Sequence, residues 1–221
     1  MIRFVLAGAL CAFPLLADTA AERLNQAATV FSEVMSAPDQ SIPQDLLDKA
    51  ECAVIVPGLK KGAFIIGAKY GRGFVSCRKE KGAGWTAPGA VRIEGGSFGF
   101  QIGGSETDVI MLVLNDRGVQ RLLSSKFTLG ADASVAAGPV GRTAQAETDA
   151  YMTAEILTWS RSRGVFAGIS LSGATLRPDA DVNRDLYGKP YENKQILRGN
   201  LPVPAAASEL IALLNKYSGR K

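Results

Sequence analysis

The stretch that decides the fold is residues 52–78, CAVIVPGLKKGAFIIGAKYGRGFVSCR. It contains three short runs rich in β-branched and aromatic residues, namely Cys52 to Val56, Ala63 to Tyr70 and Gly73 to Arg78. Such runs favour β-strands, and the glycine- and proline-containing dipeptides between them favour turns. We therefore expect three strands, the first ended by Pro57-Gly58 and the other two joined in a hairpin at Gly71-Arg72.

Helical periodicity is found on both sides of this strand-rich segment. Apolar residues recur at helical spacing over residues 19–37, which predicts an N-terminal helix, and a second short helix is expected from Pro43 to Ala50. Farther along the chain, spacing and capping residues predict helices from Asn115 or Asp116 to about Ser124, over 182–187, over 193–197, and from about Pro204 to Tyr217.

The remaining strand signals indicate a sheet core. Residues 108–114, DVIMLVL, form the most apolar run and predict a buried strand that follows a turn at Glu106-Thr107-Asp108. Further strands are expected at residues 91–93 and 97–102, and as a hairpin of 155–163 and 165–171 around Arg163-Gly164. The small residues of 129–141 suit tight packing or a close backbone approach. We predict one α+β domain, a twisted, mostly antiparallel sheet or barrel-like core flanked by N- and C-terminal helices.

The N-terminal residues predict a secretory signal. Arg3 precedes the apolar run Phe4 to Phe13, which is shorter than the roughly 20 apolar residues that span a bilayer. We expect cleavage after Ala17, so that residues 1–17 are a signal peptide and residues 18–221 the domain, exported to the periplasm or beyond by a Sec-type route. Lipid attachment at Cys11 is the less favoured alternative, because Leu10 precedes it where a small residue is usual.

The absence of histidine limits the chemistry that is available. With no His in the chain, Ser-His-Asp and Cys-His triads and His-ligated metal sites are excluded. The chain also has no Walker A motif, and its glycine cluster at 95–104 lacks the spacing of a dinucleotide site. We expect no enzymatic activity, no metal and no cofactor. A hydrolase that uses paired carboxylates alone is the remaining enzymatic alternative.

Two cysteines, Cys52 and Cys77, would remain after cleavage. Thiols of small exported domains often pair in an oxidising compartment. We predict a disulfide between them, with two buried free thiols as the alternative.

A basic cluster is the most suggestive local feature. Its cations are Lys60, Lys61, Lys69, Arg72, Arg78, Lys79 and Lys81, with Glu80 as the one acid among them. Aromatic residues are interleaved, so the cluster is a candidate contact for anionic lipid headgroups. The alternative is a solvated strand edge that lysines protect from aggregation. The formal net charge of +4 is too small to indicate nucleic acid.

Several motifs in consistent order resemble the SYLF domain family, in its exported bacterial branch. They are residues 62–78, 85–88, 95–104, 107–114, 134–142, 159–171 and 186–188. The resemblance implies a lipid-binding domain, since eukaryotic relatives bind phosphoinositides and a yeast branch binds actin. The N-terminal helix of those relatives is basic, whereas residues 19–37 here are nearly neutral, so we expect this helix to pack on the sheet.

The resulting hypothesis is a non-enzymatic protein of the periplasm or cell envelope that binds anionic, phosphatidylinositol-like or other phospholipids. The alternative is a domain of the cell envelope that interacts with another protein or has a structural role and does not bind lipid. Actin is not an expected partner of an exported protein.

Overall fold

The computed structural model describes residues 18–37, 41–64, 66–80, 83–98, 103–141, 153–162, 165–168 and 171–218. The expected signal peptide, residues 1–17 with Cys11, lies outside these ranges, as do Lys81 and the expected turn at Arg163-Gly164. Those expectations therefore stay predictions.

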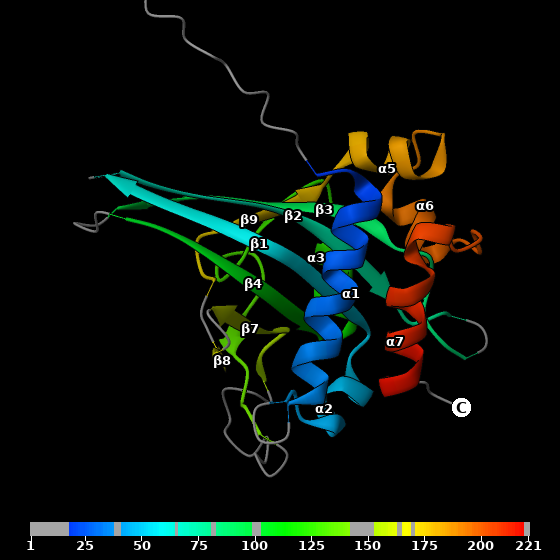
Figure 1. The fold of residues 1–221 in the computed structure, drawn as a ribbon, viewed down its shortest axis with the longest axis horizontal. Coiled ribbons are helices and arrows are strands. Elements are labelled where there is room, and N and C mark those ends of the chain that lie inside the picture. The colour runs from blue at the N-terminus through cyan, green and yellow to red at the C-terminus, as the bar shows by residue number, and fades with distance from the viewer. Residues whose placement is uncertain are drawn as a thin grey trace, which may run out of the picture.

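The described strands form one twisted sheet in the order β5-β9-β3-β2-β1-β4-β7-β6, with β8 paired to β7 (Figure 1). The strands are β1 (Cys52–Phe64), β2 (Ile66–Cys77), β3 (Gly89–Phe98), β4 (Gly103–Val113), β5 (Phe127–Thr128), β6 (Val135–Ala137), β7 (Ile156–Ser162), β8 (Val165–Gly168) and β9 (Thr175–Pro178). Apart from the parallel pair β6–β7, the described ladders are antiparallel.

Helices cover this sheet and confirm the predicted α+β class. They are α1 (Ala20–Ser36), α2 (Gln44–Lys49), α3 (Asp116–Leu122), α5 (Ala180–Tyr187), α6 (Asn193–Arg198), the 3₁₀ turn η1 (Ala205–Ala207) and α7 (Ser208–Ser218). The helices and the residue 155–171 hairpin expected from the sequence are present, and the sheet is flanked by the N- and C-terminal helices α1 and α7 (Figure 1).

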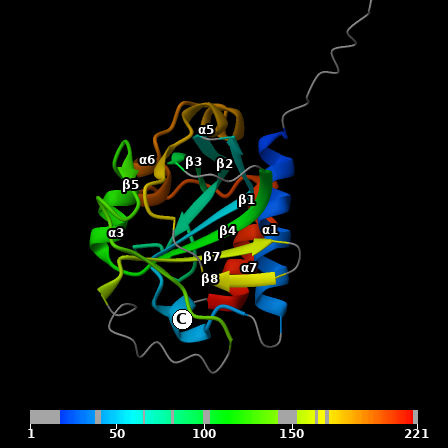
Figure 2. The ribbon, with the colours of Figure 1, turned by 90° about the vertical axis from the view of Figure 1, so that its left-hand side faces the viewer.

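Alternation along the central strands produces two hydrophobic cores. On one face, residues such as Ile55, Phe74 and Ile110 pack under α1 and α7, which run side by side. On the other face, residues such as Val54 and Met111 pack toward α3 and β5, which lie on the opposite side of the sheet from α1 (Figure 2). The nearly neutral α1 therefore packs on the sheet, as expected, and uses its apolar stripe for that purpose.

A β-bulge in β1 overturns the expected strand end at Pro57-Gly58. The strand continues through these residues to Phe64, and its register shifts between Val56 and Leu59 against β4 and between Ile55 and Lys60 against β2. Gly58 has φ +58°, and a Cβ there would lie 2.6 Å from a carboxylate oxygen of Glu106. The Pro-Gly pair is therefore a bulge signal rather than a strand terminator.

The expected turn at Gly71-Arg72 is also wrong, because both residues lie inside the continuous strand β2. A Cβ on Gly73 would lie 2.1 Å from the carbonyl oxygen of Ile55, and one on Gly71 would lie 2.8 Å from a methyl group of Leu59. The glycines thus permit close approach of the bulged strand. Similarly, Glu106-Thr107-Asp108 is part of β4 and not a turn.

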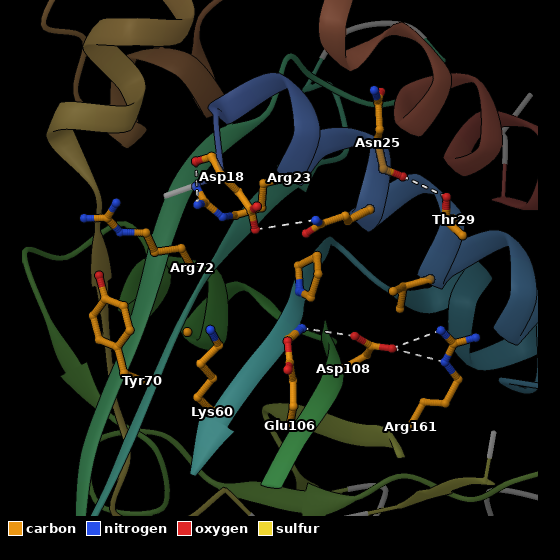
Figure 3. A pocket seen from close by; sticks show the side chains of 15 residues that line it. Asp18, Arg23, Asn25, Thr29, Lys60, Tyr70, Arg72, Glu106, Asp108 and Arg161 are labelled. Carbon is orange, nitrogen blue, oxygen red and sulfur yellow. Dashed lines mark hydrogen bonds and ion pairs between the residues drawn. The ribbon is translucent and has the colours of Figure 1, made fainter. Parts of the chain in front are cut away.

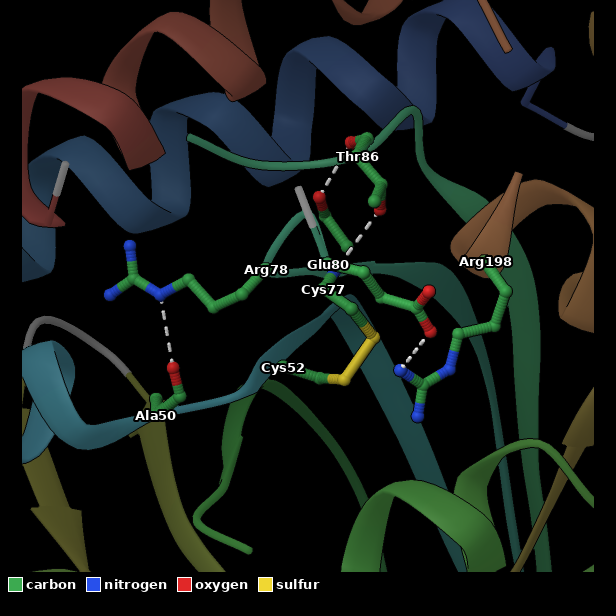
Figure 4. Close-up of a disulfide and its surroundings, with 8 residues drawn as sticks. Ala50, Cys52, Cys77, Arg78, Glu80, Thr86 and Arg198 are labelled. Carbon is green, nitrogen blue, oxygen red and sulfur yellow. Dashed lines mark hydrogen bonds and ion pairs between the residues drawn. A yellow bond between two sulfur atoms is a disulfide. The ribbon is translucent and has the colours of Figure 1, made fainter. Parts of the chain in front are cut away.

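The predicted disulfide between Cys52 and Cys77 is present, with Cα atoms 3.9 Å apart (Figure 4). The two residues are register partners on β1 and β2, and both are buried. The bond therefore closes the end of the β1–β2 hairpin that lies away from its turn.

Replacing both cysteines with alanine should lower the free energy of unfolding by about 3 kcal/mol, because the bond closes a loop of 25 residues in the unfolded chain. Urea unfolding with and without reductant measures this. Reductant should destabilise the wild type and leave the double variant unchanged. Full reaction of the unfolded, unreduced wild type with a thiol reagent would contradict the bond.

Candidate functional site

A cavity of about 700 Å³ opens between the N-terminal half of α1 and the sheet (Figure 3). It is lined by Asp18, Arg23, Asn25, Gln26, Thr29, Val30, Pro57, Gly58, Lys60, Tyr70, Gly71, Arg72, Glu106, Asp108 and Arg161. We call this cavity the groove. Its floor comes from β1, β2, β4 and β7, and its wall is the polar side of α1.

The floor is charged because the helix-covered face of the sheet changes character beyond the bulge. On that face, Ile55 and Phe74 are buried in the core, whereas Lys60 and Arg72 lie next along the same strands and line the groove. Because the bulge adds one residue, Pro57 and Gly58 both border the groove and Lys60 follows on the same face. The bulge therefore places a cation over the floor.

The wall is fixed by the start of α1. Thr19 and Glu22 form a capping box in which the Thr19 backbone N–H donates to the Glu22 carboxylate at 2.8 Å. The hydrogen bonds from Thr19 hold the pKa of Glu22 below its usual value. Arg23 donates to the Asp18 carbonyl at 2.9 Å. These contacts turn the first residues of the helix back over the groove.

Arg161 and Asp108 are paired with each other at one end of the groove. Nε and Nη2 of Arg161 lie 3.1 and 3.0 Å from Asp108 Oδ2, and the Gly58 N–H donates to Asp108 Oδ1 at 3.0 Å (Figure 3). Burial raises the pKa of Asp108, the hydrogen bond from Gly58 acts against that rise, and neighbouring Glu106 adds to it. Arg161 also pairs with Glu33 on α1, so its charge is used to join helix and sheet.

Arg72 is engaged at the other end. Its Nε lies 3.0 Å from Oδ2 of Asp179, a carboxylate with no exposed surface at the start of α5. Neither atom has hydrogen-bonding geometry with a partner among the described residues, so charge alone holds the pair. The Arg72 guanidinium also lies 5.9 Å from the centre of the Tyr70 ring.

Lys60 is the groove cation that remains available. It is exposed, and its register partners are Tyr70 on β2 and Glu106 on β4. Within the described part of the chain, neither Lys60 nor Glu106 forms an ion pair. Tyr70 is 44% exposed beside Lys60. A ligand on the groove floor therefore meets the ammonium group of Lys60, the carboxylate of Glu106 and the ring of Tyr70.

The structure divides the cations of the predicted basic cluster among separate places. Of the cluster members that the structure describes, Lys60 and Arg72 line the groove. Lys61 and Lys69 are register partners that point to the opposite face, where burial and then repulsion from Lys69 lower the pKa of Lys61. Lys79 is exposed beyond the far end of β2.

Arg78 is buried and serves the fold. Its guanidinium lies 4.1 Å from the Trp85 ring centre and donates to the carbonyls of Leu47, Ala50 and Ser218. These contacts join β2 to the ends of α2 and α7. Arg78 is only 7% exposed and its guanidinium is engaged in these contacts, so it is not placed to bind a headgroup.

Several groove residues were not anticipated from the sequence. The sequence predicts a turn at Glu106-Thr107-Asp108. If this segment had been predicted as a strand, side-chain alternation would have placed Glu106 and Asp108 on the same face. Arg161 pairs with Glu33, which lies 128 positions away in the chain, and no local sequence pattern predicts such a contact. The described residues contain no cluster of three or more potential metal ligands, and among them no helix has the length and apolarity needed to cross a membrane.

Comparison with known proteins identifies related chains. The family model Ysc84, described as "Las17-binding protein actin regulator", matches residues 94–217. The SH3 domain-containing YSC84-like protein 1 of Rattus norvegicus is 35% identical over 191 residues, covering 85% of this chain and 56% of the relative. The human protein of that name is 35% identical, and the match covers 85% of this chain and 55% of the relative. Protein YSC84 of Saccharomyces cerevisiae is 34% identical, and the match covers 80% of this chain and 38% of the relative. The chain thus spans about half, or less, of these relatives.

Replacing Arg72 with alanine should destabilise the fold by about 3 kcal/mol, because it leaves the buried Asp179 carboxylate without its counter-charge. Urea unfolding measures the change. The matched control is Arg184→Ala, which removes an exposed pair with Asp181 on α5 and should cost less than about 1 kcal/mol. Equal effects of the two substitutions would show that the Arg72–Asp179 pair is not needed.

Proposed function

Because the chain belongs to the Ysc84 (SYLF) family, we propose that it is a non-enzymatic protein that binds the phosphate-bearing headgroup of an anionic phospholipid in the groove between α1 and the sheet. The observation that carries this proposal is the exposed, unpaired Lys60 on the groove floor beside Tyr70. A cation near an anionic membrane surface contributes about 1 kcal/mol, and a tyrosine suits the boundary between headgroups and water.

The lining supports a headgroup rather than a whole lipid. A volume of about 700 Å³ is within the range of small-molecule sites. Charged and amide side chains line most of it, and acyl chains in such surroundings would leave these groups without water. We therefore propose that the acyl chains stay in the bilayer and that the protein docks on the membrane surface.

The proposed place of action is the periplasm or cell envelope. Support comes from the composition of residues 1–17, with Arg3 before an apolar run and a small residue at position 17. Actin, which the family description mentions, is not proposed as a partner, because an exported protein would not meet it.

A protein partner is the second candidate. The family description names the binding of a protein, Las17, by members of the family. In addition, the groove carries the free carboxylate of Glu106 next to Lys60, a mixed pair that suits a peptide as well as a headgroup. If a protein is the partner, the chain would not bind vesicles, and cross-linking in cells from residue 60 would recover that protein.

Replacing Lys60 with serine should weaken binding to vesicles about fivefold, because it removes about 1 kcal/mol of attraction. Co-sedimentation of residues 18–221 with phosphatidylglycerol-containing vesicles at low salt measures this. Lys79→Ser is the matched control, since it makes the same charge change at an exposed site away from the groove and should bind like wild type. Failure of the wild type to sediment, or equal binding of all three proteins, would contradict the proposal.

A further inference from the structure

Three arginines lie side by side across the strands next to the groove. In the β2–β3 register Arg72 is opposite Arg92, and in the β3–β9 register Arg92 is opposite Arg177. Their strand neighbours Val91, Ile93 and Leu176 are buried in the core of the opposite face. Since side chains alternate along strands, all three arginines point to the face that carries α1. We call Arg72, Arg92 and Arg177 the arginine row.

This arrangement has an electrostatic cost that the fold offsets only in part. Like charges directly opposite on neighbouring strands repel. Glu94 pairs with both Arg92 and Arg177, and Asp179 pairs with Arg72. No third carboxylate forms an ion pair with the row within the described residues. Three guanidinium groups therefore share two carboxylates, and one positive charge is left over.

The row also has more hydrogen-bond donors than acceptors. The Nε atoms of all three arginines are buried and make no hydrogen bond within the described structure, although those of Arg72 and Arg92 lie 3.0 Å from the carboxylate oxygens of their ion-pair partners. The hydrogen bond found there joins Arg177 to Glu94. The side chains are nevertheless 33%, 27% and 39% exposed, so that a dissolved group can reach them.

We propose that the arginine row is an oxyanion site that binds a phosphate group. Guanidinium donors match phosphate oxygens in pairs, and neighbouring strands are about 4.8 Å apart, so two adjacent arginines can hold one phosphate. The bound anion would supply the missing negative charge. Because Arg72 also lines the groove, the site adjoins the proposed headgroup site, but it does not depend on Lys60.

The first arm of the experiment uses inorganic phosphate and no membrane. Phosphate is titrated into the folded protein at constant ionic strength, with chloride as the balancing anion, and amide NMR shifts of β2, β3 and β9 are followed. Arg92→Gln should weaken phosphate binding about tenfold, because it removes a charge-assisted contact. Arg184→Gln on α5 makes the same charge change in an exposed pair and should bind phosphate like wild type.

The second arm separates a lipid phosphate from a free one. Vesicles containing phosphatidic acid replace inorganic phosphate, and the same variants are compared by co-sedimentation. Loss of binding in Arg92→Gln, with Arg184→Gln unaffected, supports the row in either arm and identifies the source of the phosphate. Arg177→Gln, at the row's outer end, repeats the test if the Arg92 variant does not fold.

Two results would overturn the site. One is the absence of any wild-type response to phosphate or to phosphatidic acid. The other is equal weakening by Arg92→Gln and Arg184→Gln, which would indicate attraction by net charge alone. Failure of the headgroup proposal gives a different pattern, in which Lys60→Ser binds vesicles like wild type while the Arg92 dependence of phosphate binding persists.

Discussion

The extra residue that β1 accommodates between Val56 and Leu59 is the constraint on which the groove depends. Before it, odd-numbered residues such as Ile55 face the helices; after it, Leu59 faces the opposite core and Lys60 takes the helix side. The bulge is held by the positive φ of Gly58 and by the hydrogen bond from its N–H to Asp108. One backbone irregularity therefore sets both the lining of the groove and the position of Asp108, which pairs with Arg161 at one end of it.

The sequence predicted the elements better than it predicted their junctions. α1 was predictable because its apolar spacing and its Thr19–Glu22 capping box agree, and the buried strand at residues 108–114 had an equally local signal. The disulfide joins residues 25 positions apart and was predicted from the number of cysteines and the expected compartment. The β1–β2 hairpin was misjudged because glycine marks turns and close packing alike. Gly71 and Gly73 serve packing, which becomes visible only when the positions of Leu59 and Ile55 on the neighbouring strand are known.

The candidate site could be predicted only in part, because the fold decides how exposed a charged side chain is and which ion-pair partners it has, and both affect its ability to bind a ligand. In the linear sequence, seven cations between residues 60 and 81 suggest one basic surface. In the fold, Arg78 supports the C-terminal helix, Arg72 neutralises Asp179, and Lys61 and Lys69 point away from the groove. Meanwhile Arg92 and Arg177 join Arg72 through strand register, which no local pattern encodes. Family membership, by contrast, rests on motifs spread along the chain and was recognisable directly.

The attachment of Arg78 to Ser218 has a consequence for the order of folding. These residues are 140 positions apart, and the same contact positions α7, whose Leu210 and Leu214 complete the core under α1. A chain still emerging from the ribosome cannot close that core until α7 has been made. Contacts of such long range are formed slowly, because a large loop must first be ordered. The apolar face of the sheet under α1 therefore stays partly uncovered until α7 has docked, and an unfolded chain exposes that face to other molecules for as long as docking takes.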